Sequence, residues 1–84
     1  MYYVYIAYQP LKKAYLVGVT NMLTRRMRLL RQMYAGPVYV VYYETYQSST
    51  EADRRENQWL DYSAAQLQEL VRKNNPHHLD ILKP

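Results

Sequence analysis

Two adjacent arginines, Arg25 and Arg26, occupy a position from which a side chain could bind a phosphate. They close the segment AYLVGVTNMLTRR, whose first part is an apolar stretch that reaches Gly18. Thr20 and Asn21 come next, and both residue types often cap the start of a helix. The arginines therefore fall about one turn into the predicted helix. A guanidinium there is either ordinary solvated surface or a group directed at a phosphate, whose oxygens it matches in charge and geometry.

The apolar spacing of this helix distinguishes the two arginines. Arg26 lies in a row of otherwise apolar residues, whereas Arg25 lies farther round the helix, toward water. We therefore expect Arg25 at the surface and Arg26 directed at a ligand, unless Arg26 merely covers the edge of the core with its aliphatic stem. The main apolar stripe, spaced by four, three and four residues, consists of Leu23, Met27, Leu30 and Tyr34.

A carboxylate farther along the chain, Glu56, is predicted to face inward. It shares one side of a later helix with Ala52 and Trp59. A charged group on an apolar side needs a partner, which makes Glu56 a candidate for a functional site. The alternative is a surface ion pair with Arg55 or Arg26.

Positive charge is concentrated in the first half of the chain, whose net charge overall is +4. No acidic residue precedes Glu44, so the six bases before it give +6, and the later seven acids and five bases give −2. This asymmetry favours an anionic partner, nucleic acid first, although arginines on one helix also keep an outer face soluble. The six early bases are Lys12, Lys13, Arg25, Arg26, Arg28 and Arg31.

Length and composition narrow the class of protein. The 84 residues suffice for one small domain, predicted to span residues 1–84. Cysteine is absent, which excludes disulfides and thiolate metal sites. No apolar run approaches the roughly 20 residues that cross a bilayer, and the first residues lack the layout of a signal peptide. We therefore expect a soluble, cytoplasmic protein.

Turn and cap residues predict the element order β-β-α-β-α-α and an α+β fold. The strands are predicted to form a small three-stranded sheet with an antiparallel hairpin, flanked by the helices. The third strand, dense in β-branched and aromatic residues, is predicted to be central. Thr20 or Asn21 should cap the first helix, Ser49 or Thr50 the second, and Ser63 the third. The predicted strands span residues 1–7, 14–20 and 38–46. The first predicted helix runs from about residue 22 to 34, the second begins near residue 50, and the third ends near residue 74.

The order of these segments resembles a known family. YVYI, YLVGVTN, a helix with an arginine pair, VYYE, RRENQ and NP follow one another as in the GIY-YIG endonucleases, particularly their small stand-alone bacterial members. The likeness covers nearly the whole chain, and the combination is more specific than any single motif. It implies a metal-dependent phosphodiesterase that acts on DNA with one Mg²⁺ or Mn²⁺ ion.

The resemblance also implies roles for individual residues. Tyr5 matches the tyrosine of the first half-motif, Gly18 the glycine of the second, and Arg26 the catalytic arginine. Glu56 matches the glutamate that binds the metal, as suits a cation that prefers oxygen ligands. Arg26 and Glu56 would meet over the sheet, near the Tyr5 hydroxyl that positions water. Residues expected to bind the substrate are Gly18, Thr20, Asn21, Arg25, Lys12 and Lys13.

Several positions depart from the family pattern. The second tyrosine of the motif falls at Leu16, and Tyr15 beside it should point to the opposite face unless a bulge intervenes. A histidine common in small members falls at Leu30. The connection after the first helix is shortened to RQMYAGP. Lysines usual on the last helix are replaced by Ala64, Ala65, Gln66 and Gln68. These losses predict a weakened or inactive nuclease.

The alternative function is therefore a catalytically inactive module of the same fold that binds nucleic acid or self-associates. An apolar patch of Leu29, Leu30 and Met33 would supply the contact for a homo-oligomer, unless the short connection covers it. Tyr5 could be an ordinary core residue. His77 and His78 precede Asp80, but we expect a polar tail there rather than a metal site.

Overall fold

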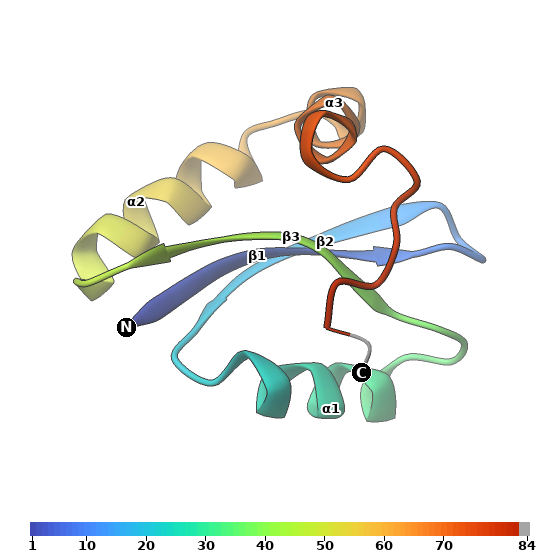
Figure 1. The fold of residues 1–84 in the computed structure, drawn as a ribbon, viewed down its shortest axis with the longest axis horizontal. Helices are drawn as coiled ribbons and strands as arrows, with labels where there is room; N and C mark the ends of the chain where they lie inside the picture. Colours follow the sequence, from blue (N-terminus) through green and yellow to red (C-terminus); the bar gives the residue numbers. More distant parts are fainter. Residues whose placement is uncertain (83–84) are drawn as a thin grey trace.

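The computed structural model describes residues 1–82 and contains one antiparallel sheet of three strands. The strands are β1 (Tyr2–Gln9), β2 (Ala14–Thr20) and β3 (Tyr39–Tyr46), in the order β2-β1-β3 (Figure 1). The predicted hairpin of β1 and β2 is confirmed. The predicted central position of β3 is wrong, because β1 pairs with both other strands. The tyrosines of β3 instead suit an edge strand, where their rings pack and their hydroxyls reach polar partners.

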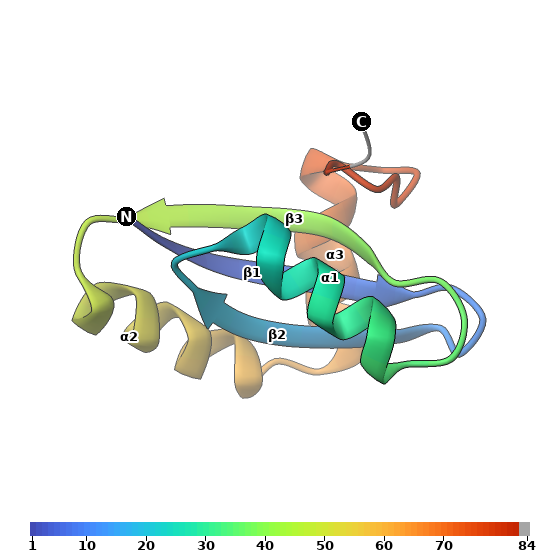
Figure 2. The ribbon, with the colours of Figure 1, turned by 90° about the horizontal axis from the view of Figure 1, so that it is seen from below.

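Helices cover both faces of the sheet, and the element order β-β-α-β-α-α is confirmed. Helix α1 (Leu23–Met33) lies on one face, whereas α2 (Ser49–Leu60) and α3 (Ala64–Asn74) lie on the other (Figure 1). Seen from below, α1 crosses the sheet obliquely and α2 runs beside the end of β2, which it contacts (Figure 2). No helix within residues 1–82 combines the length and the apolar character needed to cross a membrane.

The alternation of side chains along β1 divides the apolar core into two layers, because successive residues of a strand point to opposite faces. Tyr5 and Ala7 face α1, whereas Val4 and Ile6 face α2 and α3. The α1 layer is completed by Leu23, Met27, Leu30, Val38 and Val40. The other layer is completed by Val41, Ala52, Trp59, Leu67 and Val71.

The second and third helices begin at serine caps. The Ser48 hydroxyl accepts the backbone N–H of Glu51 at 3.2 Å, so the cap of α2 precedes the predicted Ser49 or Thr50. Ser63 caps α3 as predicted, in a reciprocal capping box with Gln66. These caps satisfy backbone donors that have no partner inside the helix.

The segment after α3 docks against the sheet and passes β3 toward α1 (Figure 1). The buried Asn75 side chain donates to the carbonyls of Val41, at 3.0 Å, and Leu79, at 2.8 Å. The N–H of Ile81 donates to the Val40 carbonyl at 2.9 Å, and Asp80 pairs with Arg31 of α1 at 2.9 Å. This segment therefore joins the two faces of the fold.

Candidate active site

Tyr5 and Gly18 form the floor of the candidate site. They are direct partners across β1 and β2, and Tyr5 is only 3% exposed. The Tyr5 ring lies so close over Gly18 that a Cβ at this position would collide with the hydroxyl and the ring. Glycine is therefore required here by close packing. Its absence of a side chain lets the Tyr5 hydroxyl reach over the edge strand β2.

Arg26 meets that hydroxyl from α1. Its Nη1 donates to the Tyr5 hydroxyl at 3.4 Å, a long and therefore weak hydrogen bond. Arg26 is half-buried, whereas Arg25 is exposed, as the apolar spacing of the helix indicates. The Arg26 guanidinium makes no ion pair within residues 1–82, so most of its donors remain available to a ligand.

The start of α1 has no side-chain cap, which corrects the predicted cap at Thr20 or Asn21. The N-cap residue is Met22, and no acidic residue lies in the first turn. Thr20 instead accepts the Met22 N–H at 3.1 Å, ahead of the helix. The first backbone N–H groups of α1 consequently point out of the helix end, where the helix dipole also favours an anion.

A hollow of about 350 Å³ lies at this uncapped helix start. Asn21 lines it from the β2–α1 connection, Arg25 lines it from the first turn of α1, and Tyr3 and Tyr43 line it from the sheet. The two tyrosine rings pack edge to face with their centroids 5.6 Å apart. Asn21 and Arg25, both predicted to bind substrate, are thus placed next to the exposed helix end.

Glu56 lies on α2, on the other face of the sheet. Ala52 and Trp59 of this helix are fully buried, and Arg55 reaches Glu44 of β3 on one flank. Because successive helical residues are about 100° apart, Glu56 lies on the opposite flank of α2 from Arg55. Glu56 is half-buried and makes no hydrogen bond or ion pair within the described part of the chain. The alternative of a surface pair with Arg55 or Arg26 is therefore excluded.

The two charged side chains do not meet over one face of the sheet, and that expectation is wrong. Arg26 comes from the helix on the Tyr5 face, whereas Glu56 comes from a helix on the Val4 face. The Tyr5 hydroxyl that Arg26 meets lies over Gly18 of β2, an edge strand that α2 also contacts.

The comparison with family models decides the family of this chain. The model of the GIY-YIG catalytic domain matches residues 1–69 of the 84. The chain belongs to the GIY-YIG family. The comparisons with curated proteins and with solved structures gave no match. The GIY-YIG family is a family of nucleases, and the observed order of strands and helices is consistent with its fold.

The missing tyrosine of the second GIY-YIG half-motif has no substitute on the Tyr5 face. Leu16 packs on that face, in the α1 layer. Tyr15 points to the other face, where its hydroxyl is 2.7 Å from Nε2 of His78. The pairing of β1 with β2 is continuous from Tyr3 to Gln9, so no bulge redirects Tyr15. The prediction from strand alternation is confirmed.

Lys12 and Lys13, also predicted to bind substrate, lie away from Tyr5 and Gly18 of the candidate site. They belong to the turn between β1 and β2. Gly18 lies four strand residues beyond Ala14, or roughly 13 Å at the usual rise of a strand. The two lysines therefore lie at the turn end of the hairpin, away from Gly18.

The apolar patch predicted on α1 loses one of its three members. Leu30 is only 8% exposed and belongs to the α1 core layer. Leu29 and Met33 are exposed by 48% and 64%.

Two residues of the segment after α3 have polar partners within the protein: Asp80 pairs with Arg31, and His78 with Tyr15. Among residues 1–82, no group of three or more histidine, cysteine or acidic side chains is arranged to hold a metal.

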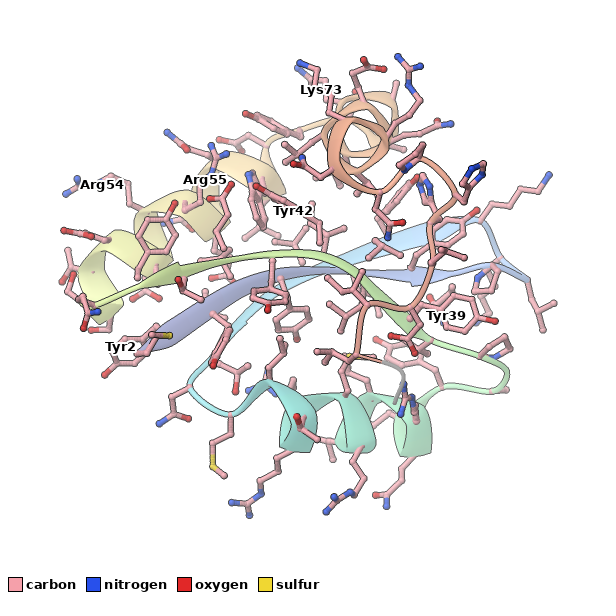
Figure 3. The ribbon with its side chains drawn as sticks, viewed as in Figure 1. Tyr2, Tyr39, Tyr42, Arg54, Arg55 and Lys73 are labelled. Carbon is pink, nitrogen blue, oxygen red and sulfur yellow. The ribbon has the colours of Figure 1, made fainter. Side chains whose placement is uncertain are left out.

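A network around Glu44 was not predicted from the sequence. Its carboxylate accepts Tyr42 and Tyr46 hydroxyls at 2.6 and 2.7 Å, and Nε and Nη2 of Arg55 at 2.9 and 3.1 Å. The Arg55 guanidinium also lies 5.0 Å from the centroid of the Trp59 ring. Figure 3 shows Arg55 on the same side of the sheet as Tyr42, while Arg54 extends away. The sequence does contain a signal for part of this network, because Tyr42, Glu44 and Tyr46 alternate along β3 and therefore share one face of the strand.

The network changes the acidity of its members. Burial raises the pKa of Glu44, but hydrogen bonds from Arg55, Tyr42 and Tyr46 outweigh burial and hold that pKa below 4.5. Burial and the hydrogen bond to Glu44 raise the pKa of Tyr42 to about 12. The Glu44 carboxylate is thus kept ionised and fully occupied, so it is a structural group rather than a free ligand.

Proposed function

We propose that this chain is an endonuclease that hydrolyses phosphodiester bonds of DNA with a bound Mg²⁺ or Mn²⁺ ion. One observation supports the proposal beyond family membership. The Arg26 guanidinium donates a hydrogen bond to the Tyr5 hydroxyl, which lies over Gly18, and Arg26 itself lies near the uncapped start of α1. A guanidinium, a phenol and free backbone donors at one place suit a phosphate that gains negative charge during reaction.

The phosphate would bind between Arg26 and the start of α1. Arg26 offers donors that no carboxylate of the described chain occupies, and the first turn of α1 contains no acid to compete with an anion. Arg25 and Asn21, in the adjacent hollow, would hold the neighbouring part of the strand. The guanidinium and the helix end would together stabilise the charge of the pentacoordinate phosphorus.

Glu56 fits the family's requirement for a divalent cation. It is half-buried without an ionic partner among the described residues, as a carboxylate kept for a cation should be. A single carboxylate is enough for Mg²⁺, which commonly keeps several waters beside one or two such ligands. A bound ion would polarise a phosphoryl oxygen and stabilise the charge that develops on it.

Tyr5 would position the attacking water through its hydroxyl, which Arg26 orients from the other side. Leu16 supplies no second hydroxyl, and Tyr15 is held on the opposite face by His78. We therefore expect slow cleavage. This observation also favours a second candidate function, a non-cleaving module that binds nucleic acid through the same basic surface.

A plasmid-nicking assay with Mn²⁺ tests the proposal. The wild type should convert supercoiled DNA to open circles, and Glu56→Gln should lower the rate at least about 100-fold. Asp53→Asn is the matched control, because Asp53 is an exposed acid of the same helix. Equal rates for wild type and Glu56→Gln would refute the role of Glu56. Leu16→Tyr should raise the rate about tenfold, since it returns a hydroxyl to the Tyr5 face.

Absence of cleavage in both wild type and Leu16→Tyr would refute the nuclease proposal and leave the second candidate. That candidate is tested by binding of a short DNA duplex at several salt concentrations. Phosphate contacts made by Arg25 and Arg26 release counterions, so the affinity should fall steeply as salt rises. An affinity that does not change with salt would exclude nucleic acid as the partner.

A further inference from the structure

A second pocket lies on the face opposite Tyr5, where α3 and the segment after it pass the hairpin end of the sheet (Figure 1). We call it the hairpin pocket; its volume is about 460 Å³. The candidate active site uses none of its residues. The lining residues that matter here are Tyr8, Lys13, Tyr15, Arg72, His77 and His78.

One wall of the hairpin pocket consists of aromatic rings that hold one another in place. The Tyr15 hydroxyl and Nε2 of His78 are 2.7 Å apart. The Tyr8 ring packs against both, with centroid distances of 4.9 Å to Tyr15 and 5.0 Å to His78. All three side chains are only partly buried, so ring surface remains accessible to a planar ligand.

The charged residues of the lining are cations. Lys13 and Arg72 line the pocket together with His77 and the uncharged Ala64, Gln68 and Pro76, and no carboxylate is among the lining residues. Arg72 is held by Glu69 through contacts of 2.8 and 3.1 Å, which fix the guanidinium but balance part of its charge. Lys13 has no carboxylate partner within residues 1–82. The pocket therefore favours a ligand that carries negative charge.

Backbone conformation singles out the same pocket. Lys13 and His78 have φ angles of 52° and 51°, and within residues 1–82 they are the non-glycine residues with positive φ. A lysine in this conformation costs on the order of 1 kcal/mol, and a hairpin turn usually places glycine or asparagine there. Such strain is commonly found where a side chain is needed for binding. Both strained residues of the described chain line one pocket.

We propose that the hairpin pocket binds one nucleotide unit, with the phosphate at Lys13 and Arg72 and the base against the rings of Tyr8 and His78. Stacking on aromatic rings beside cations is how proteins hold unpaired nucleotides without reading their sequence. The same chemistry would take a free mononucleotide or a nucleotide within a single strand. This inference does not depend on cleavage, because the pocket lies on the other face of the sheet from Tyr5.

A nuclear magnetic resonance titration of the whole chain tests the proposal. Thymidine 5′-monophosphate should bind at least about fivefold more tightly than thymidine or inorganic phosphate alone, because it offers both base and phosphate. The largest shifts should fall on Tyr8, Tyr15 and His78, which line the hairpin pocket. Shifts confined to α1, or equal affinity for phosphate and the nucleotide, would overturn the proposal.

Two neighbouring lysines supply a matched pair of variants. Lys13→Gln should weaken nucleotide binding about fivefold, whereas Lys12→Gln, which removes the same charge outside the pocket, should leave it unchanged. Lys13→Gly should weaken binding and at the same time raise the Tm by a few degrees, since it relieves the positive φ. Equal binding by the Lys12 and Lys13 variants would refute the role of Lys13. Arg72→Gln on α3 provides an independent second test of the same kind.

A five-nucleotide oligodeoxythymidylate separates the two sources of the ligand. Tighter binding than the mononucleotide supports a single-stranded segment of nucleic acid, and equal binding supports a free nucleotide. Binding of the oligonucleotide that is unaffected by Lys13→Gln would show that the strand lies elsewhere, and would overturn the proposal.

Discussion

Arg26 and Arg55 are two half-buried arginines on opposite faces of one small sheet, and their surroundings differ sharply. Arg55 donates twice to Glu44 and once to Gln58, and it lies over the Trp59 ring. Arg26 makes one long hydrogen bond to Tyr5. The protein therefore occupies three donors of Arg55, whereas Arg26 keeps most of its donors for a ligand.

This difference separates a structural charge from a reactive one. A half-buried charge with several hydrogen-bond partners in the protein stabilises the fold and has less left to offer a ligand. A half-buried charge with few partners is less favourable for folding, and such groups are common at binding sites. The same contrast holds for the acids, since Glu44 accepts four hydrogen bonds and Glu56 accepts none within the described residues.

The largest effect should come from Arg26. Arg26→Gln removes the charge that stabilises the reacting phosphate, so DNA nicking should fall at least about 100-fold. Its free energy of unfolding should change by less than about 0.5 kcal/mol, because the lost hydrogen bond is long. Arg28→Gln, at an exposed position of the same helix, is the control and should keep its activity. A fall in stability with unchanged nicking would assign Arg26 to the core instead.

The Glu44 network should show the reverse behaviour. Glu44→Gln leaves Arg55 without its carboxylate and weakens the hydrogen bonds of Tyr42 and Tyr46, so the free energy of unfolding should fall by about 2 kcal/mol. Urea unfolding followed by the fluorescence of Trp59 measures this change. Glu51→Gln, at an exposed acid of α2, should cost less than about 0.5 kcal/mol. Similar losses for both variants would mean that the network adds no stability.

The smallest effect is on the pH dependence of stability. The folded-state pKa of Glu44 lies below 4.5, so the stability it contributes is present above that pH and is lost as the pH falls through the lower, folded value. The Tm of the wild type should therefore decline between neutral and acidic pH more steeply than that of Glu44→Gln. Thermal unfolding of both proteins over this range measures the difference. Parallel curves would show that Glu44 does not titrate with folding.

Local signals in the sequence predict much of the fold but not the strand order. The period of Leu23, Met27 and Leu30 places the buried stripe of α1, and Ser63 marks the start of α3. The composition of β3 was misleading, because tyrosine-rich strands suit an edge as well as a centre. Order within a sheet depends on pairing between distant segments, and residue composition does not encode it.

Some residues of the candidate site could also be predicted from local sequence patterns, and others could not. Arg26 could be distinguished from Arg25 because the distinction depends on helical period alone. The places of Glu56 and of the two lysines depend on which face each helix covers and on how far the hairpin extends. The Glu44 network joins β3 to α2 across eleven residues, and no local pattern identifies that partner. Contacts of this range become visible only in the folded chain.

The segment that follows α3 has a consequence for the behaviour of this protein in concentrated solution. Its Ile81 N–H donates a hydrogen bond to the Val40 carbonyl of β3. β3 is an edge strand, and its other edge pairs with β1. An open strand border is a template on which a second molecule can add its own strand. The segment after α3 covers part of the exposed edge of β3, and this limits the tendency of the protein to aggregate.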